Sequence, residues 1–209
     1  MDIAYSNAAH RQFGDNTDFL ALRTYVLNHD MRKDEHYQYL TERIDVQSLI
    51  DWYICRTFMG DGDTANIRRF RSLEYDQKWR WMFFDMDWGF NWMNDRPLSR
   101  VTNHGGDWTL MQAVLTNKTG RDAFLSRYAY LMDTALDPER INGLIDELIG
   151  SFESELARDR KRWGVSMDTW ESEVAFIRQF VNKRRKYIIN HLQSYFQLSS
   201  KEVAHYFGE

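Results

Sequence analysis

The sequence has little cysteine, little proline and no long apolar run. It contains 209 residues, of which one is cysteine (Cys55) and two are proline. A single cysteine excludes an internal disulfide and a zinc site built from several cysteines, but it does not decide the compartment. No apolar stretch approaches the roughly 20 residues of a membrane span, and the N-terminus has no signal-peptide pattern. We expect the chain to have been cut from a longer protein, with residues 1–15 irregular.

A strong charge of one sign is also lacking. The 27 basic and 31 acidic residues leave a formal net charge of −4. Binding along a nucleic acid needs a basic surface, so we expect no nucleic-acid partner. The motifs GxxxxGK[ST], GxGxxG, HExxH and GxSxG do not occur, which excludes the usual signatures of P-loop, dinucleotide-binding, zinc-protease and serine-hydrolase sites.

Helical periodicity is the dominant pattern in the chain. A chain of this length can bury a sizeable core as a single domain. Capping residues support the periodicity: Asp45 before one apolar run, Thr119 before another, and Asp137 followed by Pro138 before a third. The pattern predicts helices at 18–30, 34–44, 45–59, 108–117, 120–135, 138–162, 168–196 and 200–207.

The residues between the third and fourth predicted helices do not follow a helical pattern. We predict a strand at 66–72, a turn near 74–77 and a strand at 78–85, with polar and aromatic residues alternating in the second strand. Residues 88–106 read as a long loop. The predicted fold class is therefore α+β, mostly α-helical, with one small β-hairpin.

A basic run lies in the long C-terminal helix. Residues 183–186 read KRRK and are flanked by apolar residues at helical spacing. We interpret the run as a solvated helix face, and a partner that is acidic or carries phosphate is the alternative.

Acidic and amide residues gather at one end of the predicted hairpin. The apolar segment "MFFDMDWGF" ends in Asp85 and Asp87, and carboxylates at the end of an apolar strand usually require a partner or a metal. Asp61, Asp63 and Asn66 lie in the loop before the hairpin. Because a hairpin returns the chain, residues 66 and 85 should be neighbours. Oxygen ligands without histidine or cysteine favour magnesium over zinc.

The order of these residues matches what phosphoryl transfer requires. A kinase uses an aspartate as proton acceptor, an asparagine a few residues later, and a metal-binding aspartate after a hairpin. Asp63, Asn66 and the pair Asp85/Asp87 occur in this order, although Asp63 and Asn66 are three residues apart where protein kinases have five. The alternative is a surface acidic loop and a buried acid that caps a turn.

The same residues resemble the CotH kinase family, the relatives of spore coat protein H. The segment "FMGDGDTANIRRFRSLEYDQKWRWMFFDMDWGF" resembles the family's core, in which an N-I-R segment precedes K-W-R-W and a D-x-D motif. The preceding helix "IDVQSLIDWYI" and the C-terminal helices are also similar. The resemblance extends over nearly all of the chain from about residue 15.

The resemblance implies an atypical protein kinase. Such enzymes use ATP and a divalent cation, Mg²⁺ or Mn²⁺, to phosphorylate serine in proteins of the spore coat or the cell surface of a bacterium. Carried over by position, Asp63 is the catalytic aspartate, while Asn66, Asp85 and Asp87 bind the metal and the nucleotide. The motif does not decide which of Asp85 and Asp87 is the primary ligand.

Two features depart from the family pattern. Asp61 stands where many relatives have asparagine. No β-rich N-terminal lobe with a phosphate-binding lysine is evident, since Lys33 is the only lysine before Lys78. We therefore expect residues 1–209 to form a single domain equivalent to the C-terminal lobe of a kinase, with weak or no activity by itself.

Two other functions remain open from the sequence. One is a non-catalytic module, a pseudokinase or a surface or coat assembly protein, which the missing lobe and the abundant tryptophan favour. The other is glycoside or phosphodiester hydrolysis by a pair of carboxylates, which in glycosidases lie roughly 5–5.5 or 6.5–9.5 Å apart.

Overall fold

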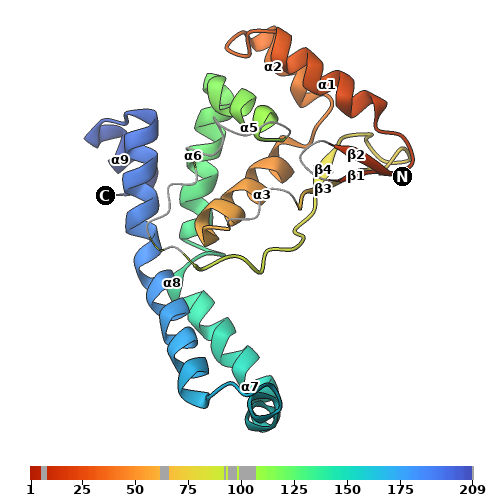
Figure 1. The fold of residues 1–209 in the computed structure, drawn as a ribbon. Helices are drawn as coiled ribbons and strands as arrows, with labels where there is room; N and C mark the ends of the chain where they lie inside the picture. The colour runs from red at the N-terminus through yellow and green to blue at the C-terminus, as the bar shows by residue number, and fades with distance from the viewer. Residues whose placement is uncertain (6–8, 62–65, 92, 94–97, 99–106, 209) are drawn as a thin grey trace.

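The structure is a computed structural model that describes residues 1–5, 9–61, 66–91, 93, 98 and 107–208. Helices form most of the molecule, and a small sheet lies at one side, next to the N-terminus (Figure 1). This arrangement confirms the predicted α+β class. None of the described helices combines the length and apolar character that a membrane span needs.

The sheet has four antiparallel strands in the order β2-β1-β3-β4. Their bounds are β1 (Asp2–Tyr5), β2 (His10–Phe13), β3 (Arg68–Arg71) and β4 (Arg80–Trp81). The predicted hairpin is present as β3 and β4, but β4 ends at Trp81 rather than at residue 85. The prediction that residues 1–15 are irregular is wrong, because β1 pairs with both β2 and β3.

Eight helices described by the structure correspond to the eight predicted ones. They are α1 (Thr17–Asn28), α2 (Asp34–Thr41), α3 (Val46–Met59), α5 (Asp107–Thr116), α6 (Lys118–Met132), α7 (Pro138–Trp163), α8 (Met167–Phe196) and α9 (Ser200–Phe207). The side chains of Asp45 and Asp137 cap α3 and α7, as expected. One cap differs: the side chain of Asn117, rather than Thr119, accepts the first N–H groups of α6.

The inner face of the sheet packs on α1 and α5. The ring of Phe19 from α1 lies 5.1 Å from the ring of Trp79, centroid to centroid, next to β4. Arg69 of β3 forms an ion pair with Asp107 of α5, with both side chains fully buried. The indole Nε1 of Trp81 donates to the same Asp107 carboxylate at 2.7 Å. These contacts fix β3 and β4 against the helical core.

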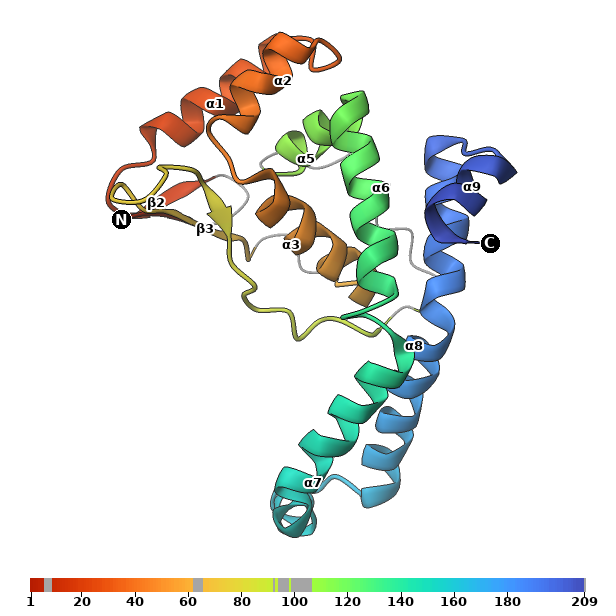
Figure 2. The same ribbon diagram turned by 180° about the vertical axis from the view of Figure 1, so that it is seen from behind.

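The paired helices α7 and α8 extend away from the rest of the molecule (Figures 1 and 2). Leu156 is the only buried residue that the structure describes in α7. Leu144, Leu148 and Phe152, spaced four residues apart on α7, are all exposed. The second half of α8 returns to the body and packs beside α9 and α6.

A buried arginine joins α8 to the end of α3. Arg184 is fully buried, and its guanidinium donates to the carbonyl oxygens of Phe58 at 2.6 Å, Thr57 at 2.7 Å and Met93 at 2.5 Å. The interpretation of the KRRK run as a solvated face is therefore wrong at Arg184, while Lys183 and Lys186 are exposed. A helix leaves its last carbonyls without internal partners, and in α3 Arg184 satisfies that of Phe58 and adds a second donor to that of Thr57, which also accepts from the N–H of Gly60 at 3.3 Å.

We expect Arg184→Met to lower the free energy of unfolding by about 2–4 kcal/mol, because it leaves buried carbonyl groups without their donors. The measurement is urea unfolding followed by circular dichroism. Lys186→Met, in the same run but exposed, is the control and should change the free energy by no more than about 0.5 kcal/mol. Equal effects of the two substitutions would contradict the anchoring role.

Strand β1 is held in the sheet by a buried ion pair. The carboxylate of Asp2 accepts from Arg71 Nε of β3 at 2.7 Å, and Arg71 Nη1 also binds Asp18 at 2.6 Å. Burial by itself raises the pKa of Asp2. The backbone N–H of Asp15 and the hydrogen bond and charge of Arg71 outweigh this effect, so the pKa lies below its usual value.

The lowered pKa predicts acid sensitivity. The unfolded chain binds more protons than the folded chain near the Asp2 pKa, so this contribution to stability is present at neutral pH and is lost as pH falls through the folded pKa. We expect the free energies of unfolding of wild type and Asp2→Asn to converge between about pH 5 and about pH 2. Urea titrations at several pH values measure this, with exposed Glu153→Gln as the control. A constant difference across the range would refute the prediction.

Candidate functional site

The two acids of the D-x-D motif lie beyond the end of β4, in an extended segment. Asp85 and Asp87 are both exposed, so the expectation of carboxylates at the end of a buried strand is wrong. The sequence suggested burial because apolar residues precede the acids, but Phe83 is itself 59% exposed. Asp85 has a φ of 53°, in the left-handed region that aspartate and asparagine tolerate better than most residues.

The structure brings Asn66 and Asp85 together. The amide Nδ2 of Asn66 donates to Asp85 Oδ2 at 2.6 Å, across 19 residues of sequence. This contact confirms the prediction that the hairpin makes residues 66 and 85 neighbours. On the other side, Asn66 Oδ1 accepts a hydrogen bond from the hydroxyl of Tyr5, at the end of β1. A non-glycine residue in the left-handed region, bound to a polar partner, is a common feature of functional sites.

Of the other two predicted site residues, Asp63 and Asp87, only Asp87 lies in the described part of the chain. Asp87 begins a turn in which the N–H of Gly89 donates to the carbonyl of Met86 at 3.3 Å. Its carboxylate has no hydrogen-bond or ion-pair partner among the residues that the structure describes. Asp63, the predicted catalytic aspartate, lies outside the described residues. Within the described part of the chain, no three histidine, cysteine or acidic residues gather in a way that could hold a metal.

One arginine of α3 holds the described residues on either side of Asp63. Arg56 Nη2 lies 2.5 Å from Asp61 Oδ2, and Arg56 Nη1 donates to the backbone carbonyl of Asn66 at 3.2 Å. Both side chains of the ion pair are almost fully buried, with 2% of Arg56 and none of Asp61 exposed. Asp61 therefore has a structural role, and the site's carboxylates must come from other positions.

The segment after the acids is attached to the far end of α3. The N–H of Phe90 donates to the carbonyl of Met59 at 2.6 Å, and its ring meets that of Phe180 in α8 edge to face, 5.4 Å between centroids. In Figure 1 this segment runs along α3 from β4 toward α8. Asp85 and Asp87 thus lie on a stretch that is fixed by β4 at one end and by α3 and α8 at the other.

Asn66 and Asp85 suit a magnesium ion in type and number. Mg²⁺ takes oxygen ligands and is commonly held by one or two carboxylates, with the remaining positions filled by water and substrate phosphates. The carboxylate of Asp85 and the side-chain amide of Asn66 meet at one point, with the NH₂ group of the amide on the side of Asp85, and the exposed carboxylate of Asp87 follows two residues later. These residues fit a divalent cation once the amide oxygen, rather than the NH₂ group, is on the side of Asp85.

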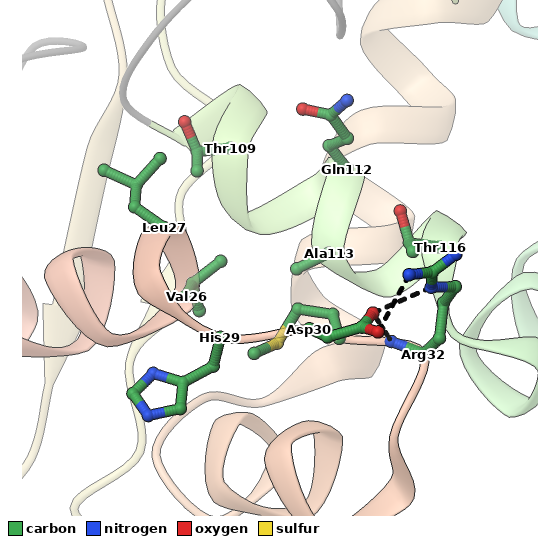
Figure 3. A pocket seen from close by; sticks show the side chains of 10 residues that line it. Val26, Leu27, His29, Asp30, Arg32, Thr109, Gln112, Ala113 and Thr116 are labelled. Atoms are coloured by element: carbon green, nitrogen blue, oxygen red, sulfur yellow. Dashed lines mark hydrogen bonds and ion pairs between the residues drawn. The ribbon is translucent and has the colours of Figure 1, made fainter.

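A pocket near α5 and the thiol of Cys55 are less suited to be a functional site. A pocket of about 400 Å³ lies between the α1–α2 connection and α5 (Figure 3). Its charged residues, Asp30 and Arg32, bind each other at 2.8 Å, and the hydrogen bond from Arg32 lowers the pKa of Asp30 to about 2. Burial raises the pKa of the Cys55 thiol to about 11, and the neighbouring Asp51 adds to the effect, so Cys55 is unsuited to thiolate chemistry.

Two residues that hold the site, Tyr5 and Arg56, were not predicted from the sequence. Tyr5 lies in a stretch that was expected to be irregular, and a four-residue strand gives little periodic signal. Arg56 lies in the apolar pattern of α3, where a buried cation was not expected. A signal was available for Arg56, since a charged residue on the buried face of a helix requires a buried partner.

We expect Asp61→Asn to lower the free energy of unfolding by about 3–5 kcal/mol, because the buried Arg56 guanidinium loses its carboxylate. The double variant Asp61→Asn/Arg56→Met should lose less free energy of unfolding than the sum of the losses in the two single variants. Urea unfolding measures both. The control is Asp30→Asn in the exposed ion pair with Arg32, which should cost far less stability because solvent screens the pair. A loss in Asp61→Asn no larger than in this control would contradict the prediction.

Comparison with known proteins identifies a family. A scan against protein-family models matches residues 2–188 to the family described as CotH kinase protein. Searches of the curated proteins and of the solved structures found no match. The matched region begins at β1, so it includes the strand that carries Tyr5, and it ends within α8. Since it spans most of the 209 residues, the chain is kinase-like and belongs to the CotH kinase family.

Proposed function

We propose that the protein is an atypical protein kinase that transfers the γ-phosphate of ATP to serine residues of proteins in the spore coat or at the cell surface of a bacterium. The contact between Asn66 and Asp85 is the observation that carries this proposal. It places an amide and a carboxylate at one point, in the chain order that a kinase requires, within a chain of the CotH kinase family.

The four predicted residues divide into a proton acceptor and three residues that hold the cation. Asp63 accepts the proton of the serine hydroxyl while the serine oxygen bonds to the γ-phosphorus and the bond from that phosphorus to ADP breaks. Asn66, Asp85 and Asp87 hold the divalent cation, Mg²⁺ or Mn²⁺, with Asp85 as the primary carboxylate because it contacts Asn66. The cation, when bound, neutralises charge on the phosphates.

The arrangement supports hydrolysis less well. A glycosidase needs two carboxylates that face each other across the substrate. In the described part of the chain, the side chain beside Asp85 is the amide of Asn66 rather than a second carboxylate. A non-catalytic assembly module has one observation in its favour, the exposed apolar residues Leu144, Leu148 and Phe152 on α7.

In keeping with the weak activity expected of residues 1–209 by themselves, we expect at most slow transfer of labelled phosphate from ATP to a casein-like protein in the presence of Mg²⁺ or Mn²⁺. Asp63→Ala and Asp85→Asn should each lower kcat/KM by at least about 100-fold. Asparagine is chosen at position 85 because it tolerates the left-handed backbone, so that the charge is removed without strain. Exposed Glu153→Ala on α7 is the control and should retain full activity.

Binding measurements separate the kinase from the assembly module. Isothermal titration with Mg²⁺ and ATP should show binding to the kinase, whereas a scaffold should bind neither. The kinase proposal fails if the wild-type chain transfers no phosphate and binds no nucleotide. Equal activity of wild type and Asp85→Asn would reject the assigned site.

A further inference from the structure

Three segments that are distant in sequence meet at the side chain of Asn66. Strand β1 runs antiparallel to β3, which sets Tyr5 opposite Arg68, two residues after Asn66. The hydroxyl of Tyr5 donates to Asn66 Oδ1, and Asn66 Nδ2 donates to Asp85 Oδ2 at 2.6 Å. The Asn66 amide is therefore held between a phenol on one side and a carboxylate on the other.

The two ends of this amide differ chemically. The oxygen accepts hydrogen bonds and can bind a cation, whereas the NH₂ group only donates. In the structure, the NH₂ group faces Asp85 and the oxygen faces Tyr5. A cation shared by Asn66 and Asp85 requires the reverse orientation, with the amide oxygen on the side of Asp85.

A tyrosine hydroxyl can accommodate both orientations because it is a donor and an acceptor. It donates to the amide oxygen in the arrangement seen here, and it can accept from the NH₂ group when the amide is turned. A phenylalanine at this position could do neither. The partner of a ligating side chain commonly sets its orientation and raises its affinity for the metal.

We propose that Tyr5 is the positioning residue for Asn66, changing from hydrogen-bond donor to acceptor as the amide turns its oxygen toward a divalent cation held with Asp85. This inference rests on the proposed metal site. It gives β1, which contributes no predicted ligand, a role in metal binding through the orientation of Asn66.

The surroundings of Tyr5 hold its ring in place. The buried ion pair between Asp2 and Arg71 fixes β1 in the sheet. The guanidinium of Arg68 lies 5.4 Å from the centre of the Tyr5 ring and 3.8 Å from the centre of the Phe84 ring. Because Phe84 directly precedes Asp85, this stack links the Tyr5 ring to the backbone that presents the carboxylate.

The test is Tyr5→Phe, which removes only the hydroxyl. We expect the Kd for Mn²⁺, measured on the whole chain by electron paramagnetic resonance of unbound Mn²⁺, to rise about tenfold. Tyr75→Phe, at a position that is 77% exposed, is the matched control and should leave the Kd unchanged. The readout is metal affinity and does not depend on catalysis.

A second pair of variants separates orientation from general stability. Asn66→Asp places an oxygen at both ends of the side chain, so no hydroxyl is needed to select the end that faces the cation. We expect Tyr5→Phe to raise the Kd less than threefold in this background, while a merely structural role would give the same rise in both backgrounds.

The outcomes distinguish this inference from the proposed function. Equal Mn²⁺ affinity of wild type and Tyr5→Phe overturns the role of Tyr5 and leaves the metal site standing. The role of Tyr5 is also overturned if Tyr5→Phe raises the Kd by the same factor in the wild-type and the Asn66→Asp backgrounds. No Mn²⁺ binding by wild type at millimolar concentration overturns the metal site, and the role of Tyr5 with it.

Discussion

The candidate site depends on the ion pair between the buried guanidinium of Arg56 and the carboxylate of Asp61. The guanidinium binds Asp61 and the carbonyl of Asn66, so a single side chain of α3 fixes the described residues on either side of Asp63. An ion pair away from water is costly unless both partners are satisfied. The position of Asn66, and hence its contact with Asp85, therefore depends on the packing of α3 in the core.

The helices could be predicted from the sequence because their signals are local. Apolar spacing and the caps at Asp45 and Asp137 depend on residues within a few positions of one another. The two N-terminal strands could not be predicted, since β1 is stabilised by β3, more than 60 residues away. Arg184 was misread for the same reason: the carbonyls that it binds belong to α3 and to the segment after β4, far from α8 in sequence.

The candidate site was predictable in part. The order of Asn66 and Asp85 around a hairpin was sufficient to predict that they meet, because the two strands bring their ends together. The exposure of Asp85 was not predictable, since the apolar residues before it gave no sign that β4 stops at Trp81. Tyr5 was missed because its partner is chosen by strand pairing, which no pattern within residues 1–15 encodes.

The length of α8 has a mechanical consequence. Its 30 residues span about 45 Å as one continuous helix, from the tip of the extended hairpin to the body of the molecule. Arg184 joins this helix to the last turn of α3, the same turn that carries Arg56. A force applied to the hairpin of α7 and α8 would therefore be transmitted along α8 to the end of α3, where Arg56 holds Asp61 and Asn66.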